Sequence, residues 1–573
     1  MRRNTRLTFL CLLALIAMLL CSCTAKHAEP TEEKPPVASA AEGEEAQETT
    51  AAEAVITEGH HYREKAYAAD FKTYRLELDG CTVDMESRLY DEAALRAAGE
   101  QIQQTLAAMS EAVGTPAQKV EVYLVKQTLS DRAQAVGNRV FCTPEDLEEL
   151  RYRPVLAQAA YALPRPWQGV GLSRYVFEAA PDAEVLRSYY EDAAHINVLS
   201  LCPMYYLPDF ADAETVEMAE QTAQSVTACV LETDGMDAFR ALDRTMDAVA
   251  PWALANEIEE PALPEGYEAV DALAVAGVSD HSVILQADAP MDHFRFVLEP
   301  TDWIATAEDF YAYLCRFYAG YHVMLDQMEA ALPTAFAQVR QNAEQQITVE
   351  FINTNRNSGG GNNTVSIGSG GAIWHEVMHN MLLTHGVDSA DHWLDEGLAE
   401  YFALPVETQF GGHMEESVYQ YLTDTAWHEQ MTADEKTHLD CIIRCYTARF
   451  EMPEDPCEID YAWLYRSFAI TTLLRSELEL GDYALLMNMR SLQARAGREA
   501  GPKEAEGNGL TYPEALLMVD YLAERYGIDH VVSSYLVHAS CETAYGKAYP
   551  ALYEEFYAWV QESYGDLIED ANS

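Results

Sequence analysis

The feature that most constrains this chain is a pair of histidines four positions apart, His375 and His379, with Glu376 directly after the first. Residues four apart share one face of an α-helix, so a helix here can present both imidazoles to one zinc ion. Glu376 then stands beside the metal, where a general base for an attacking water is needed. Apolar residues flank the pair and predict that this helix packs against a core: Ala372, Ile373, Val377, Met378, Met381 and Leu382.

A second helix-like segment follows, from Trp393 to Phe402 (WLDEGLAEYF), with Glu396 lying 17 positions beyond His379. The HExxH pattern by itself is moderately specific, and its alternative interpretation is a surface helix that carries two solvated histidines. The acidic second segment favours the metal site over that alternative.

Together these segments resemble the gluzincin metallopeptidases, the group that includes thermolysin and the aminopeptidase N family. They look most like bacterial members with a Trp-Leu-x-Glu-Gly-Leu-Ala-Glu-Tyr motif, here Trp393 to Tyr401. The resemblance covers about residues 290–573, with its strong motifs confined to 374–402. It implies an α+β fold, in which a mixed sheet carries the HExxH helix and a helical C-terminal subdomain follows. It also implies Zn²⁺ as cofactor, with Glu396 as the third protein ligand.

The resemblance further assigns roles to neighbouring residues. A carboxylate one turn after Glu396, here Glu400, accepts a hydrogen bond from the first ligand histidine and fixes its tautomer. Asp395 competes for that role less convincingly, because it faces another way on the helix. His385 and His392 are interpreted as loop histidines, since three protein ligands already complete a catalytic site.

Two strands are predicted upstream of the histidine pair. Gln346 to Asn353 (QITVEFIN) alternates apolar and polar residues, and Thr364 to Gly368 (TVSIG) follows a Gly/Asn-rich loop. In the resembled family an edge strand at this place pairs with the substrate backbone. The candidates for substrate binding are therefore Val365, Ser366 and Ile367, by strand addition. An ordinary hairpin is the alternative.

A tyrosine is expected to complete the catalytic set. The aminopeptidase N family has a helix that begins with its catalytic tyrosine, and the run from Tyr512 to Gly527 (YPEALLMVDYLAERYG) is similar to it. Tyr512 is then the donor to the oxyanion of the tetrahedral intermediate, with Tyr461 and Tyr465 as alternatives. The Gly-x-Met-Glu-Asn element that recognises a free amine in aminopeptidase N relatives is missing before Trp374. The sequence thus leans away from a typical aminopeptidase and leaves endopeptidase and exopeptidase activity open.

The first half of the chain contains a weak internal repeat of the second. Trp167 to Tyr175 (WQGVGLSRY) parallels Trp393 to Tyr401, sharing tryptophan, glycine, leucine and tyrosine in register. A strand-like KVEVYLV precedes it at nearly the same spacing. Further along, the segment that begins at Glu220 echoes the one that begins at Tyr512. Coincidental similarity is the alternative.

The chemistry is absent from this first copy. Val170 stands at the position of Glu396, and Arg174 stands at the position of Glu400. Residues 156–160 (LAQAA) contain neither histidine nor glutamate. We therefore expect a degenerate, metal-free copy of the peptidase fold.

The N-terminus predicts export and lipid anchoring. Three arginines precede the apolar run from Leu7 to Leu20, which suits a signal peptide, and Leu-Cys-Ser-Cys then resembles a bacterial lipobox that ends at Cys23. An ordinary cleaved signal peptide is the alternative. Lipid on Cys23 tethers an exported cell-surface lipoprotein to the bacterial membrane. Length and composition predict a signal peptide at 1–22, a disordered tether at 23–57, the degenerate domain at 58–262 and the peptidase domain at 263–573.

Charge and cysteines limit the partners. The formal charge of −56 argues against nucleic acid, so the expected partner is a peptide or protein substrate, with the membrane contacted only through the anchor. Cys441, Cys445 and Cys457 cluster, and a disulfide among them is possible in an exported protein. The competing functional hypothesis is a non-catalytic surface lipoprotein that uses a peptidase-like fold for binding. A zinc-dependent hydrolase that acts on something other than peptides is a further alternative.

Overall fold

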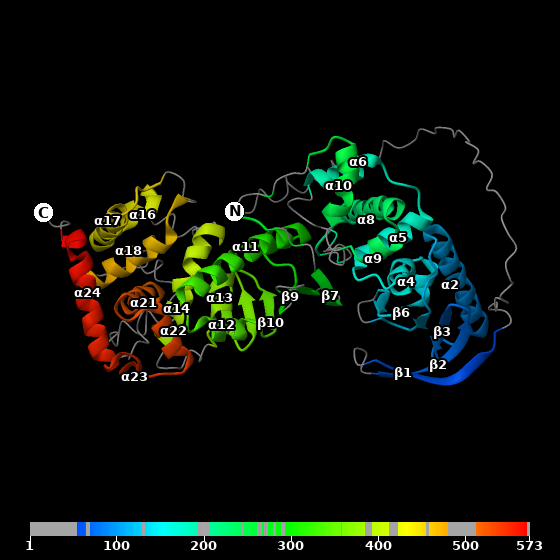
Figure 1. The fold of residues 1–573 in the computed structure, drawn as a ribbon, viewed down its shortest axis with the longest axis horizontal. Coiled ribbons are helices and arrows are strands. Elements are labelled where there is room, and N and C mark those ends of the chain that lie inside the picture. The colour runs from blue at the N-terminus through cyan, green and yellow to red at the C-terminus, as the bar shows by residue number, and fades with distance from the viewer. Residues whose placement is uncertain are drawn as a thin grey trace, which may run out of the picture. The chain divides into compact units, whose positions relative to one another are not determined.

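Alternating apolar residues build two six-stranded sheets in the computed structural model of this protein (Figure 1). Both sheets are mixed and carry helices, in agreement with the predicted α+β class. The predicted signal peptide, Cys23 and the tether up to residue 53 lie outside the described part of the chain. The structure describes residues 54–64, 69–128, 132–192, 199, 207, 209–242, 245–259, 263, 266–268, 270, 273–278, 282–287, 291, 293–356, 358–383, 392–411, 422–453, 458–478 and 511–569.

The first sheet has the strand order β1-β2-β3-β4-β6-β5. Strands β1 to β3 form an antiparallel meander, a helical crossover adds β4 parallel to β3, and β6 lies parallel to β4 with β5 antiparallel on its outer side. The strands are β1 Ile56–Glu64, β2 Ala69–Leu78, β3 Cys81–Glu86, β4 Val120–Leu124, β5 Gln134–Val136 and β6 Arg139–Cys142.

The second sheet repeats this arrangement strand for strand, in the order β7-β8-β9-β10-β12-β11. Its meander is again antiparallel, β10 is parallel to β9, β12 is parallel to β10, and β11 is antiparallel on the outer side. The strands are β7 Leu273–Val278, β8 Val283–Ala287, β9 Phe294–Leu298, β10 Ile347–Phe351, β11 Gly359–Gly361 and β12 Thr364–Ile367. Both predicted strands of this region, now β10 and β12, are present.

Helices lie both between the strands and after each sheet. The first half contains α2 Glu92–Val113, α3 Pro144–Glu148, α4 Tyr152–Tyr161, α5 Pro166–Phe177, α6 Ala183–Asp192, α8 Ala213–Thr233, α9 Gly235–Arg240 and α10 Thr245–Ala255. The second contains α11 Ala307–Ala331, α12 Phe336–Ala343, α13 Ala372–Met381, α14 His392–Val406, the π-helix η3 Glu407–Gly411, α16 Thr425–Gln430, α17 Ala433–Thr447, α18 Tyr461–Leu474, α21 Tyr512–Tyr526, α22 Ile528–Leu536, α23 Cys541–Tyr545 and α24 Tyr549–Glu569.

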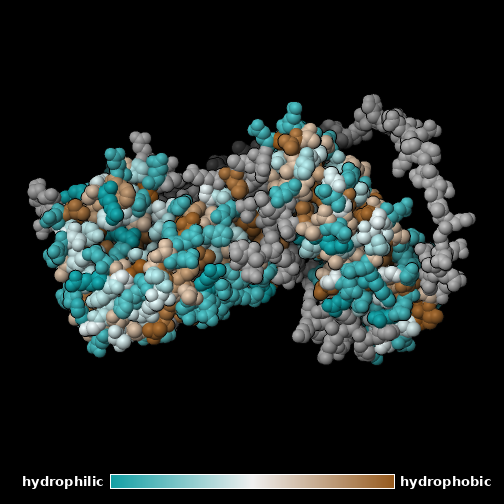
Figure 2. All heavy atoms as spheres, viewed as in Figure 1, coloured by the Kyte–Doolittle hydropathy of each residue, from teal (hydrophilic) through white to brown (hydrophobic). Residues whose placement is uncertain are grey.

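The core beneath the second sheet is aromatic. Helix α11 places Phe317 edge-on against Phe294 of β9, with ring centroids 5.3 Å apart, and Phe310 edge-on against Phe351 of β10. These rings are almost fully buried, so α11 is held firmly against the sheet. On the visible face of the molecule, hydrophobic residues form separate spots among hydrophilic ones (Figure 2). In the described part of the chain, no helix combines the length and hydropathy needed to cross a bilayer.

Candidate metal centre

Helix α13, which carries the histidine pair, is held close to α11 by a tryptophan and a glycine. Trp374 donates its indole N–H to the carbonyl of Phe317 over 3.3 Å. A Cβ on Gly320 would lie 2.6 Å from the same indole nitrogen, so only glycine allows this approach. The tight contact fixes the rotation of α13 and directs His375 and His379 inward, where they are 7 % and 5 % exposed.

The far end of α13 is fixed by an asparagine. Asn380 donates to the carbonyl of Glu376 over 3.2 Å, and its side-chain oxygen accepts the backbone N–H of Asn363 over 2.8 Å. The side-chain N–H of Asn342 donates to the carbonyl of Met381, the last residue of α13, over 2.9 Å. These bonds tie α13 to the β11–β12 turn and to α12.

Helix α14 reaches the centre because glycine lets it pack tightly on α21. A Cβ on Gly397 would lie 2.6 Å from the carbonyl oxygen of Ala515. Helix α21 itself begins at Tyr512, because Thr511 and Glu514 form a reciprocal capping box at its N-terminus. Helix α14 also packs on α13 (Figure 1). This packing brings Glu396 to the two histidines.

The three predicted ligands converge on one point. The Nε2 atoms of His375 and His379 lie 3.1 Å apart. One oxygen of Glu396, Oε2, lies 3.1 Å from the first and 3.5 Å from the second. In the described residues these three side chains form the one group of histidine, cysteine and acidic residues arranged to hold a metal ion.

Two further carboxylates face the outer nitrogens of the imidazoles. Glu400, one turn after Glu396, lies 3.4 Å from Nδ1 of His375. Asp395 lies 3.3 Å from Nδ1 of His379, a partner that sequence reasoning missed. Each carboxylate favours a proton on Nδ1, which leaves both Nε2 lone pairs directed at the Glu396 oxygen. Three electron-pair donors that meet in this way can hold a cation between them.

The electrostatics of the centre also favour a cation. Burial alone would lower the pKa of His375, but the nearby carboxylates of Glu396 and Glu400 outweigh burial and raise that pKa. Burial likewise opposes the effect of Asp395 on His379, whose pKa is raised to about 10. For Glu396, burial would raise the pKa, yet the two imidazoles lower it. In the absence of metal, the centre therefore holds protons where a metal ion would bind, and the two compete.

Tyr512 lies next to the centre, whereas the alternative tyrosines pack elsewhere. The ring of Tyr512 stands edge-on to the ring of His375, with centroids 5.8 Å apart. The rings of Tyr461 and Tyr465 are tilted against each other, with centroids 5.4 Å apart, and line a small apolar cluster with Leu404. Of the three candidates, Tyr512 has the described contact with a ligand histidine.

The two other histidines named from the sequence differ in their outcome. His392 is not a loop residue but the first residue of α14, buried, with its Nε2 atom 3.5 Å from Oε1 of Glu396. His385 lies outside the described residues.

The expectation of a substrate-binding edge strand at Val365, Ser366 and Ile367 does not fit the topology. These residues belong to β12, which is paired on one side with β10 and on the other with β11. Its backbone groups are thus already used inside the sheet. The outer strand is β11, and a Cβ on Gly360 would lie 2.2 Å from the carbonyl oxygen of Glu376. Because Gly360 has no Cβ, the sheet edge can come this close to α13.

The corresponding place in the first half is apolar. A Cβ on Gly171 of α5 would lie 2.4 Å from the carbonyl oxygen of Ala223 in α8, as one on Gly397 would meet Ala515 in α21. This equivalence of the glycine contacts places Glu220 of α8 at the position of Tyr512. The three positions that the sequence repeat matches to the predicted metal ligands are buried and carry no ligand atoms: Leu156, Ala160 and Val170.

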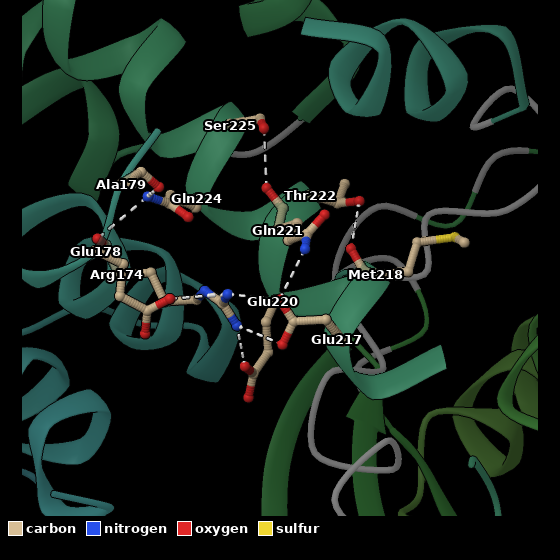
Figure 3. A network of polar contacts seen from close by, with 10 residues as sticks. All are labelled: Arg174, Glu178, Ala179, Glu217, Met218, Glu220, Gln221, Thr222, Gln224 and Ser225. Carbon is tan, nitrogen blue, oxygen red and sulfur yellow. Dashed lines mark hydrogen bonds and ion pairs between the residues drawn. The ribbon is translucent and has the colours of Figure 1, made fainter. Parts of the chain in front are cut away.

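In the first half, a charged network occupies the positions that match Glu400 and Tyr512. Arg174 of α5 pairs with Glu178 at 2.8 Å, with Glu217 of α8 at 2.7 Å, and with Glu220 (Figure 3). Burial would lower the pKa of Arg174, but these glutamates outweigh it and raise the pKa. The residues at the Glu400 and Tyr512 positions therefore bind each other directly here.

Two of the three clustered cysteines form no disulfide in the described residues. Cys441 and Cys445 are both buried free thiols one turn apart on α17, and Cys457 lies outside the described residues.

No known family model matches the sequence, and no curated protein matches it either.

Proposed function

We propose that this protein is a zinc-dependent peptidase that hydrolyses peptide bonds in peptide or protein substrates. The observation that carries the proposal is the convergence of His375, His379 and Glu396 at the junction of two buried helices, with Glu376 adjacent in α13. The resemblance of the same residues to the gluzincin motifs supports this function over a purely structural metal site, since a structural zinc site has four protein ligands.

The donor set and its spacing suit zinc. Tetrahedral zinc sites have bonds of about 2.0–2.1 Å to nitrogen and oxygen, which puts neighbouring ligand atoms about 3.3 Å apart. The separations of 3.1, 3.1 and 3.5 Å bracket that value. Two imidazoles and one carboxylate are also a ligand set found in catalytic zinc enzymes.

The reaction divides among the residues of the centre. When bound, zinc supplies Lewis-acid polarisation of the peptide carbonyl and makes water more acidic. Glu376 takes the proton from the attacking water and passes it to the leaving amine. Tyr512 donates a hydrogen bond to the carbonyl oxygen as negative charge develops on it. Glu400 and Asp395 hold the two imidazoles in the tautomer that ligation needs.

The outer strand β11 is the proposed site for the substrate backbone. Its residues Gly359–Gly361 form the edge of the second sheet and lie against α13. A peptide that adds to this edge as a further strand would pass the carbonyl of Glu376 and so reach the centre.

The first half and the anchor extend the proposal. We assign to residues 58–262 a metal-free copy of the fold, supported by the repeated strand order and by the apolar residues at the ligand positions. One zinc ion per chain is then expected. Lipid on Cys23 would keep the protein at the outside of the bacterial membrane.

The test combines metal analysis with one substitution. The full-length protein should contain about one zinc per chain and cleave peptides in a mixed library, and chelation should abolish cleavage. Glu376→Gln should keep the zinc and lose hydrolysis by about 10²–10⁴-fold, the range expected for a general base. Glu435→Gln, which changes another buried glutamate in the capping box of α17, is the matched control and should cleave normally.

The alternative is a non-catalytic surface lipoprotein that uses both halves for binding. Zinc-loaded wild type that cleaves no peptide in the library would favour this alternative. Equal cleavage by wild type and Glu376→Gln would remove Glu376 as the base.

A further inference from the structure

A tyrosine from a distant helix binds the carboxylate that faces His379. Tyr535 of α22 donates its hydroxyl to Oδ1 of Asp395 over 2.9 Å, although the two residues are 140 positions apart in the sequence. Both side chains are buried, with exposures of 3 % and 2 %. A hydrogen bond to a charged acceptor in such surroundings is stronger than one at the surface.

The same carboxylate oxygen faces the imidazole of the second ligand. Oδ1 of Asp395 lies 3.3 Å from Nδ1 of His379. A carboxylate oxygen has two acceptor sites, so it can accept from the tyrosine and from the imidazole at once. The hydroxyl of Tyr535 thus limits how Asp395 can rotate, and Asp395 in turn orients His379.

Helix α22 is well held, so it can serve as a fixed support. Its first turn carries Asp529, whose carboxylate accepts the backbone N–H groups of Thr334 and Ala335 over 3.0 and 2.9 Å. Val531 and Val532 of the same helix are fully buried. The hydroxyl of Tyr535 is therefore presented from a helix that is fastened at both its end and its inner face.

We propose that Tyr535 is a positioning residue of the metal centre, which acts through Asp395 to hold His379 in its ligating orientation. The inference rests on the proposed function only in requiring that the centre binds zinc. It assigns to α22 a part in metal affinity that no motif around the histidine pair reveals.

The experiment measures zinc affinity of the full chain by competition with a chromogenic chelator. Tyr535→Phe should bind zinc about 10-fold more weakly than wild type, the lower end of the range expected when a direct partner of a ligand histidine is removed, because Tyr535 acts one contact further out. Tyr521→Phe is the matched control. Tyr521 is also buried, and its hydroxyl donates to the carboxylate of Glu555 over 3.2 Å, away from the centre. Its zinc affinity should equal that of wild type.

A second variant separates positioning from general destabilisation. In an Asp395→Asn background, Tyr535→Phe should weaken zinc binding little further, because both changes act on one chain of contacts. Wild-type zinc affinity in Tyr535→Phe, or the same loss in Tyr521→Phe, would overturn the inference. Wild type that binds no zinc would instead overturn the proposed function.

Discussion

Gly397 controls how closely α14 approaches α21, and thereby where Glu396 lies. Its missing Cβ leaves room for the carbonyl of Ala515, which belongs to the rigid backbone of a neighbouring helix. A backbone atom cannot move aside as a flexible side chain can. The position of one proposed metal ligand therefore depends on a single residue without a side chain.

This contact predicts that replacing two different glycines by alanine changes the free energy of unfolding in opposite directions. Gly397→Ala should lower the free energy of unfolding by about 1–3 kcal/mol through overpacking and should weaken zinc binding. Gly565→Ala, also inside a helix but with its nearest neighbour at 3.9 Å, should raise stability by up to about 1 kcal/mol. Urea unfolding of both variants checks this; equal stability of the two would contradict the close packing of α14.

At the scale of elements, the sequence predicts most of the helices and strands that depend on residues close together along the chain. The strands β10 and β12, the helix with His375 and His379, and the helix that begins at Tyr512 follow from periodicity and end signals. The pairing of Asp395 with His379 was missed because it depends on how α13 and α14 cross. Similarly, the hydroxyl of Tyr535 reaches the centre only through packing of segments 140 residues apart.

The topology at the sheet edge was out of reach for a related reason. A strand-like TVSIG segment indicates a strand, but its place within the sheet depends on which neighbours pair with it. The three glycines of β11 give no apolar alternation, so the sequence offered no strand signal for the true edge. Composition showed only a glycine-rich loop at that place.

The attachment of α22 to α12 has a measurable pH dependence. Burial would raise the pKa of Asp529, but the N–H groups of Ala335 and Thr334 outweigh it and lower the pKa. The carboxylate therefore contributes stability that is fully present above its unfolded pKa of about 4. This stability is lost as the pH falls through its lower folded pKa. Asp529→Asn should therefore lower the free energy of unfolding by about 0.5–1.5 kcal/mol near pH 7, with a smaller difference near pH 3.

Urea titrations of wild type and Asp529→Asn at both pH values test this. Asp566→Asn on α24 removes an exposed carboxylate that lies outside this contact and should leave the midpoint unchanged at either pH. A pH-independent difference for Asp529→Asn would show that the charge of the carboxylate is not what holds α22.

At the scale of the whole molecule, one arrangement of strands and helices has two different centres. In the second half, helices α13, α14 and α21 meet around ligand atoms. In the first half, α4, α5 and α8 meet around buried Leu156, Ala160 and Val170. A buried apolar centre needs no ion, so the first half can be stable without metal. Arg174 in the first half stands at the position that matches Glu400 in the second half.

Arg174 is expected to stabilise the first half without affecting the metal. Its side chain is 12 % exposed and binds three glutamates, so Arg174→Met would leave those carboxylates close together without a cation. We expect a loss of about 1–2 kcal/mol in the free energy of unfolding, less than for a fully buried pair because the glutamates are partly exposed. Zinc content should stay at the wild-type value, since the network lies in the half that we propose to be metal-free.

The second substitution of this test is Glu220→Gln in the Arg174→Met background. It removes one of the uncompensated charges and should restore part of the lost stability, whereas the same change in the wild-type background should destabilise, because it weakens a pair that is intact there. Urea unfolding of the four proteins gives the coupling energy, and metal analysis gives the zinc content. Additive effects would exclude a direct Arg174–Glu220 pair, and loss of zinc in Arg174→Met would show that the first half contributes to the metal centre after all.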